Sequence, residues 1–326
     1  MKTNLRIHGL DVLFSSSHPW IFRTLLDDLS WFQAKNRGSS RPIRWEVHPL
    51  PTLDSQNGYP PGFARYRQAV LSEPGLNPAV TRQLSSNCIV LSHPGARRIE
   101  AAVVPTPLLL PDPAFHFLFT QPMSLALSKK SLFFLHAGCV AKPQGGILIV
   151  GGSHAGKTTL SLAAVRAGFQ FLSDEQPLLA PHGAGVRLLA FPRQIRLDRA
   201  GADRFLELDP VKKIQRGTLR LLFSLEKIWP KRIIESCIPR ALVFPRYRPN
   251  ASLAIGRLRP DQAMRLLQED PHFLWYPRQP WTGLCQQRLP LFRRLTRQVP
   301  AYGLHYNDRH LFQIPLLFEM WLRKTS

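Results

Sequence analysis

The sequence contains few cysteines, few acidic residues and no long apolar run. The four cysteines, Cys88, Cys139, Cys237 and Cys285, form no C-x-x-C pair and have no zinc-ligand spacing with histidine. This excludes a zinc module and a disulfide framework, and we expect free thiols in a reducing compartment. No stretch of about 18 apolar residues occurs, and the N-terminal segment lacks the apolar region of a signal peptide. We therefore expect a cytoplasmic protein with no membrane partner.

Repetitive architectures are also absent. There are 30 prolines and 20 glycines but no Gly-X-Y period, and no heptads are sustained. This excludes collagen and coiled coils. Hydrophobic residues make up 44% of the chain, which excludes overall disorder. A length of 326 residues allows one large domain or two modest ones.

The scarcity of acids leaves a strong positive charge. The chain has 43 basic and 21 acidic residues, for a formal net charge of +22. Residues 1–186 hold 17 basic and 10 acidic side chains, whereas residues 187–326 hold 26 and 11, so the excess is concentrated in the second part. Two interpretations stay open: a basic face that attracts ATP and an acidic partner, or an arginine-rich coding bias.

Composition along the chain predicts two regions. Residues 1–105 have a mixed α/β pattern, with an expected strand at 5–14 and an expected helix at 19–33. They contain no catalytic constellation, and we consider them a candidate substrate- or partner-binding region. A proline-rich run at 104–113 marks the expected boundary, and residues 106–326 form the expected catalytic domain.

A glycine-rich octapeptide is the most informative motif. Residues 151–158 read GGSHAGKT and fit G-x-x-x-x-G-K-[ST] in full. The glycines let backbone N–H groups point inward to hold phosphate oxygens, with the lysine reaching the β- and γ-phosphates and the threonine hydroxyl binding Mg²⁺. The residues expected to contact the nucleotide are Gly151, Gly152, Ser153, His154, Ala155, Gly156, Lys157, Thr158 and Thr159.

The flanking sequence supports this interpretation over a chance glycine-rich turn. An apolar segment at 146–150 is typical of a buried strand, and residues 158–167 have helical spacing. The helix N-terminus is then expected to face the anion. A turn at 142–145 joins this strand to a preceding one at 132–141, so we expect a hairpin.

Two adjacent acids follow the helix. Gly168 ends it, residues 169–173 form an expected strand, and Asp174 and Glu175 come directly after that strand. Beside the phosphate-loop strand, one carboxylate could hold metal while the other takes a proton from an attacking hydroxyl. The alternative is a solvated acidic turn.

Two further residues are candidates. His136 lies on the expected strand before the hairpin, where it is either a core histidine or a group near the γ-phosphate and the acids. Arg193, in the segment FPRQIRL, is either a phosphate clamp or part of a surface strand.

Four blocks in this order resemble the HPr serine kinase/phosphorylase superfamily, particularly its HPr-kinase-related branch. They are residues 135–138 (LHAG), the phosphate loop, residues 168–175, and more weakly residues 191–193 (FPR). The sequence departs from the family's pattern at Glu175, where HPr-specific enzymes usually have aspartate. The downstream signature of the bifunctional enzymes is also missing, and whether any phosphorylase activity exists stays open.

The resemblance implies an α/β phosphate-loop kinase core of the HPr kinase and phosphoenolpyruvate carboxykinase type. It implies ATP- and Mg²⁺-dependent phosphorylation of a serine hydroxyl on a small protein or peptide, and a tendency to form homo-oligomers. His136, Lys157, Asp174 and Glu175 would be the catalytic residues. Thr158, Asp174 and Glu175 would hold the metal, and Arg193 the nucleotide. Which acid acts as the base stays open, as does the acceptor's identity.

Two other functions remain as alternatives. A small-molecule kinase also uses a strand, loop and helix followed by an early acid, and it predicts a metabolite acceptor. A nucleotide-gated binding module with a basic face predicts salt-dependent nucleic-acid binding. The sequence carries no known nucleic-acid-binding motif, so we do not expect a nucleic-acid partner.

Overall fold

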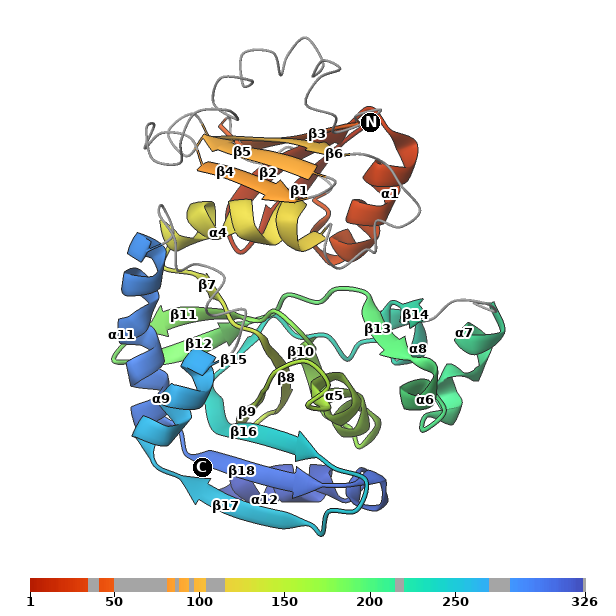
Figure 1. The fold of residues 1–326 in the computed structure, drawn as a ribbon, viewed down its shortest axis with the longest axis vertical. Coiled ribbons are helices and arrows are strands. Elements are labelled where there is room, and N and C mark those ends of the chain that lie inside the picture. Colours follow the sequence, from red (N-terminus) through yellow and green to blue (C-terminus); the bar gives the residue numbers. More distant parts are fainter. Residues whose placement is uncertain are drawn as a thin grey trace. The chain divides into compact units, whose positions relative to one another are not determined.

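The protein is a mixed α/β molecule with several sheets, seen in a computed structural model (Figure 1). The structure describes residues 1–34, 41–49, 81–85, 88–93, 97–103, 115–214, 220–269 and 282–324. Its contacts form two compact units, one of Met1–Lys130 with Arg278–Leu284 and one of Ser131–Pro277 with Cys285–Ser326. Residues 115–130 group with the first unit, and the proline-rich run at 104–113 lies outside the described residues.

The first unit is built on a six-stranded mixed sheet. Strands β2, β3 and β6 run parallel to one another, and the remaining neighbours are antiparallel. In spatial order the strands are β1 (Lys2–Ile7), β2 (Leu10–Ser16), β3 (Ile43–Pro49), β6 (Arg98–Val103), β5 (Cys88–His93) and β4 (Thr81–Ser85).

The prediction of a single strand at 5–14 was wrong. His8 and Gly9 both have positive φ angles, 45° and 77°, and they turn the chain back on itself. Such angles at both central residues define the tight turn that suits a two-residue hairpin. The segment is therefore the β1–β2 hairpin. The turn was not predicted because its first central residue is His8, whereas asparagine is the residue typical of that position.

Aromatic side chains fill the core between this sheet and its helices. Phe14 of β2 and Trp45 of β3 stack with ring centroids 4.2 Å apart. Phe22 stacks on Phe14, and Phe119 packs edge-on against Trp45. The helices are α1 (Pro19–Asp28), η1 (Ser30–Phe32), η2 (His116–Thr120) and α4 (Gln121–Ser128). The helix predicted at 19–33 thus divides into α1 and η1.

The second unit contains a six-stranded sheet, the site sheet. Its order is β10 (Gln170–Ser173), β8 (Ala137–Lys142), β9 (Gly145–Val150), β16 (Pro239–Tyr247), β18 (Ala301–Tyr306) and β17 (Ala254–Leu258). Strands β8 and β9 form the predicted hairpin, which confirms that inference. Strands β9, β16 and β18 are parallel, and β10 and β9 are each antiparallel to β8.

Two smaller sheets and several helices complete this unit. One sheet has the antiparallel order β15 (Ser236–Cys237), β12 (Gly185–Leu189), β11 (Leu178–His182) and β7 (Phe133–Phe134), and the other pairs β13 (Ile195–Asp198) with β14 (Arg220–Phe223). The helices are α5 (Lys157–Arg166), α6 (Arg199–Ala202), η3 (Leu206–Leu208), α7 (Asp209–Ile214), α8 (Leu225–Ile228), α9 (Pro260–Glu269), η4 (Asp308–His310), α12 (Ile314–Lys324) and α11 (Thr282–Gln298), of which the residues from Cys285 on belong to this unit.

Helices α5 and α12 cover one face of the site sheet. Val140, Ile147 and Ile149 alternate along β8 and β9 and belong to one buried cluster with Leu160 of α5 and Phe318 of α12. This alternation is the period of two that a sheet with distinct faces requires. Within the described part of the chain, no helix is both long and apolar enough to cross a bilayer.

Candidate functional site

Strand directions bring the predicted site residues to one edge of the site sheet. Strands β9 and β10 run in the same direction on either side of the antiparallel β8. The glycine-rich loop after β9 and the acids after β10 therefore share an edge. β8 begins at that edge, and its first residue, Ala137, pairs with Val150. The sheet order thus puts the end of the acidic strand, the segment before β8 and the glycine-rich loop next to one another.

The loop between β9 and α5 has the backbone that its glycines allow. Gly156 caps α5 with a left-handed φ of 91°, and His154 has a φ of 62°. Ser153 and His154 are exposed at the loop's tip, and Ala155 donates its N–H to the carbonyl of Gly152 at 3.3 Å. The predicted sequence of strand, loop and helix is confirmed in position and length.

Lys157 folds back over the loop that precedes it. Its Nζ donates to the carbonyl oxygens of Gly151 at 2.7 Å and Gly152 at 3.0 Å, and the residue is only 8% exposed. The ammonium is thus fixed above the loop, beside the first turn of α5. A positive charge, a helix N-terminus and a glycine-rich backbone meet at this point, which is a combination suited to an anion.

Asp174 touches the same helix. The Thr158 hydroxyl donates to its Oδ2 at 3.3 Å, and the carboxylate is only 6% exposed. Burial, followed by the negative charge of Glu175, raises the pKa of Asp174 from 3.8 to about 7, although the charges of Arg193 and Arg196 oppose the shift. A carboxylate with this pKa exchanges protons near neutral pH.

Glu175 is held by an arginine. Its Oε2 lies 2.9 Å from Nη1 of Arg193, whose side chain is 2% exposed against 29% for the glutamate. Phe191 donates its N–H to the carbonyl of Leu172, and this brings the segment carrying Arg193 beside β10. Ser173 Oγ accepts the N–H groups of the two residues after Asp174, at 3.3 and 2.9 Å. The two acids therefore differ: Asp174 faces Thr158, and Glu175 faces Arg193.

His136 lies beside the acidic pair, although not within a strand. The strand predicted at 132–141 divides into β7 and β8, which belong to different sheets, and His136 sits at the crossing. Leu135 donates its N–H to Pro177 O and Ala137 donates to Glu175 O, both at 3.0 Å. These bonds hold the backbone of His136 against the segment after Asp174.

Sequence reasoning missed a packed pair of tyrosines beside the glycine-rich loop, Tyr306 and Tyr247, which we call the tyrosine floor. Tyr306, the last residue of β18, is 2% exposed, and its hydroxyl occupies the space that a Cβ on Gly156 would need. Its ring packs edge-on against Tyr247, the last residue of β16, with centroids 5.6 Å apart. Burial raises the pKa of Tyr306, so its hydroxyl stays protonated.

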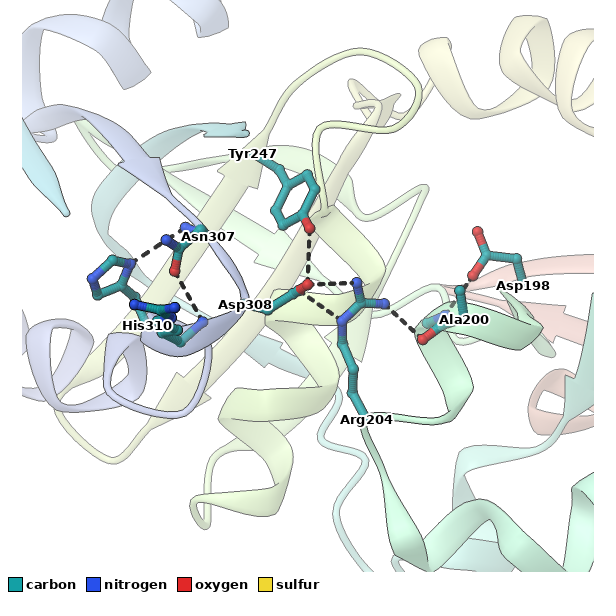
Figure 2. Close-up of polar contacts among 9 residues, drawn as sticks. Asp198, Ala200, Arg204, Tyr247, Asn307, Asp308 and His310 are labelled. Carbon is teal, nitrogen blue, oxygen red and sulfur yellow. Dashed lines mark hydrogen bonds and ion pairs between the residues drawn. The ribbon is translucent and has the colours of Figure 1, made fainter. Parts of the chain in front are cut away.

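An ion pair anchors this tyrosine floor. Figure 2 shows Arg204 reaching both carboxylate oxygens of Asp308, at 2.8 and 3.1 Å, while Tyr247 Oη donates to Asp308 at 2.9 Å. Arg204 also donates to the carbonyl of Ala200 at 2.7 Å. Hydrogen bonds from Arg204 hold the pKa of Asp308 below its ordinary range. No local motif signals this network, because its members come from three distant segments.

Comparison with known proteins adds little. No family model matches the sequence, and no curated protein matches it. Among solved structures, the HPr(Ser) kinase/phosphatase from Coxiella burnetii aligns with 59% of this chain and 94% of its own. The sequence identity is 13% and the TM-score 0.30. This is a remote structural relation, and it does not establish the chemistry of the site.

A glycine substitution tests the tyrosine floor. Gly156→Ala should lower the free energy of unfolding by at least about 2 kcal/mol, because it adds strain at a positive φ and overlaps Tyr306. Gly152→Ala is the matched control, since a Cβ there meets nothing within 4 Å, and its effect should stay within about 0.5 kcal/mol. Urea unfolding of the ligand-free proteins measures both. Equal midpoints for the two variants would show that Tyr306 does not restrict the loop.

Proposed function

We propose that this protein is a phosphotransferase that moves the γ-phosphoryl group of ATP to a serine hydroxyl of a small protein or peptide. The observation that carries the proposal is the contact of Thr158 with Asp174 beside the loop over which Lys157 is fixed. Phosphoryl transfer requires positioning and charge stabilisation at one point, and these three side chains supply an ammonium, a hydroxyl and a carboxylate there. The choice of serine and of a peptide acceptor comes from the resemblance of the sequence blocks.

The residues present fit Mg²⁺. This ion takes oxygen ligands and is usually held by one or two carboxylates together with substrate phosphates and water. The Thr158 hydroxyl and the Asp174 carboxylate, 3.3 Å apart, provide two such oxygens. No group of three or more ligating side chains occurs among the described residues, and none is needed for a metal carried in with a nucleotide. Bound Mg²⁺ would neutralise charge on the phosphate oxygens.

Side chains and backbone N–H groups of the protein would carry out phosphate binding, proton transfer and charge compensation. Lys157 and the loop N–H groups hold the phosphates, and Lys157 balances charge on the transferring group. Asp174 accepts a hydrogen bond from the acceptor hydroxyl and takes its proton as the phosphoryl group moves, and bound Mg²⁺ would lower the pKa of about 7 that Asp174 has without metal. Arg193 compensates the charge of Glu175, which limits the repulsion between two adjacent carboxylates. His136 supports the acidic pair from the segment between β7 and β8.

A transfer assay tests the proposal. The full chain is incubated with Mg²⁺ and ATP labelled at the γ-phosphate, together with cell extract separated into macromolecular and low-mass fractions. We expect label on a macromolecule, and the bond should survive acid and break in alkali, as a serine phosphate ester does. A parallel incubation with Lys157→Ala identifies label from contaminating kinases.

The distribution of label separates the alternatives. Label that appears only in the low-mass fraction would make the protein a small-molecule kinase. Failure to bind ATP in isothermal titration calorimetry, together with no labelled product, would refute phosphotransfer altogether. ATP binding without any transfer, combined with nucleic-acid binding that weakens steeply as salt rises, would instead support the nucleotide-gated module.

A further inference from the structure

Two thiols that are distant in the sequence meet between two sheets of the second unit. The Sγ atoms of Cys139 and Cys237 lie 4.0 Å apart, although the residues are separated by 98 positions. Cys139 is in the middle of β8 in the site sheet, and Cys237 ends β15 in the neighbouring four-stranded sheet. Both are free, with Cys139 buried and Cys237 partly exposed.

Strand register shows why the two sulfurs face each other. Cys139 pairs with Leu148 of β9, so their side chains share a face of the sheet. Gly146 is two positions from Leu148 and lies on the same face. A Cβ at Gly146 would overlap the Sγ of Cys237. The glycine therefore makes room for the sulfur of Cys237 on the face that carries Cys139, opposite the face covered by α5 and α12.

We propose that Cys139 and Cys237 form an oxidation site, at which a peroxide oxidises the two thiols to an intramolecular disulfide. A disulfide has sulfurs about 2.05 Å apart, so the two Sγ atoms need to approach by about 2 Å. The backbone beside Cys237 is hydrogen-bonded to the β8–β9 hairpin, since Gly146 donates its N–H to the carbonyl of Ile238 at 2.8 Å, so the two thiols approach each other from segments that are already joined. The proposal concerns the thiols alone and does not depend on phosphotransfer.

The exposure of each thiol sets the order of the steps. Cys237 is the reachable thiol, and its sulfur takes one oxygen from the peroxide to give a sulfenic acid and one water. Cys139 Sγ then attacks Cys237 Sγ, the S–O bond breaks, and a second water leaves as the S–S bond forms. Two thiols lose two electrons in total, and one hydrogen peroxide accepts them. Burial raises the pKa of the Cys139 thiol, which disfavours Cys139 as the thiol that first attacks the peroxide.

Peptide mapping tests the site directly. The reduced full chain is treated with hydrogen peroxide, remaining thiols are blocked with N-ethylmaleimide, and the protein is digested with trypsin without reductant. Mass spectrometry should find the peptides 131–157 and 233–240 cross-linked, because each contains one cysteine of the pair. Dithiothreitol should separate them. The peptides of Cys88 and Cys285, the two other cysteines, are quantified in the same digest.

Two variants distinguish the roles of the thiols. In Cys139→Ser, Cys237 should stop at the sulfenic acid, which dimedone traps, and in Cys237→Ser, Cys139 should stay reduced under the same treatment. Because a change at buried Cys139 can disturb folding, the wild-type cross-link remains the deciding measurement. Recovery of Cys139 and Cys237 as separate alkylated or overoxidised peptides, while no cross-link forms, would overturn the proposal.

Discussion

Replacing Lys157 by alanine should reduce phosphoryl transfer from ATP by on the order of 10³-fold and leave the fold intact. The ammonium is fixed over the loop by the carbonyls of Gly151 and Gly152, and its charge is positioned before any phosphate arrives. Alanine removes that charge from the point where negative charge must be balanced. Steady-state kinetics with labelled ATP measure the loss, and circular dichroism verifies the fold.

Lys142→Ala provides the matched control. Lys142 ends β8 at the opposite edge of the site sheet, where it pairs with Glu319 at 3.1 Å. A partly exposed pair of this kind contributes at most about 1 kcal/mol to stability, and its removal should leave transfer unchanged. Lys157→Arg should also be impaired, since a planar guanidinium does not reproduce a compact ammonium. Full activity in Lys157→Ala would remove the glycine-rich loop from the mechanism.

The sequence was most informative where structure depends on local signals. An apolar strand, a glycine-rich loop and a helix could be placed because each follows from neighbouring residues, and the structure has β9, the loop and α5 at those positions. Gly168 ends α5 with a φ of 91°, as its position predicted. Acids near the loop were also expected, but the acidic strand β10 lies beside β8 and not beside the phosphate-loop strand β9.

The sequence was least informative where long-range packing decides. Tyr306, Tyr247 and Arg204 surround the loop's base only after β16 and β18 have joined the sheet beside β9. The division of the segment at 132–141 has the same origin. Its apolar residues look like one strand, yet Phe133 pairs with Leu179 in one sheet while Ala137 pairs with Val150 in another. Both outcomes depend on partners dozens of residues away.

The different partners of the two acids also could not be read from the sequence. Adjacent carboxylates look equivalent there, and either one could be assigned to the metal or to the proton. Arg193 removes the equivalence, because it neutralises Glu175 at 2.9 Å and leaves Asp174 against a hydroxyl. Burial, followed by the charge of Glu175, raises the pKa of Asp174 to about 7, which makes Asp174 the residue at which a substitution should have opposite effects on activity and stability.

Asp174→Asn should reduce transfer by about 10²–10⁴-fold and, at pH 8 without metal, should raise the free energy of unfolding. The pKa of Asp174 is raised from 3.8 to about 7 in the folded protein, so the folded state holds this proton more tightly. Stability is therefore lost as pH rises between those values, by about 4 kcal/mol in the limit. Asparagine carries no charge and avoids that loss, so its advantage should grow from pH 5 to pH 8. Urea unfolding in EDTA at both pH values measures this.

Asp308→Asn is the opposing control. Hydrogen bonds from Arg204 and Tyr247 lower the pKa of Asp308, so its carboxylate stabilises the fold above its unfolded pKa. The same chemical change at this position should therefore destabilise the protein at pH 8, and the difference should shrink as pH falls toward the carboxylate's titration range. If both variants lost stability equally at pH 8, the charged Asp174 carboxylate could not be destabilising the folded protein. A gain in stability for Asp174→Asn with a loss for Asp308→Asn would show that the charged Asp174 carboxylate destabilises the fold at pH 8, as its raised pKa requires.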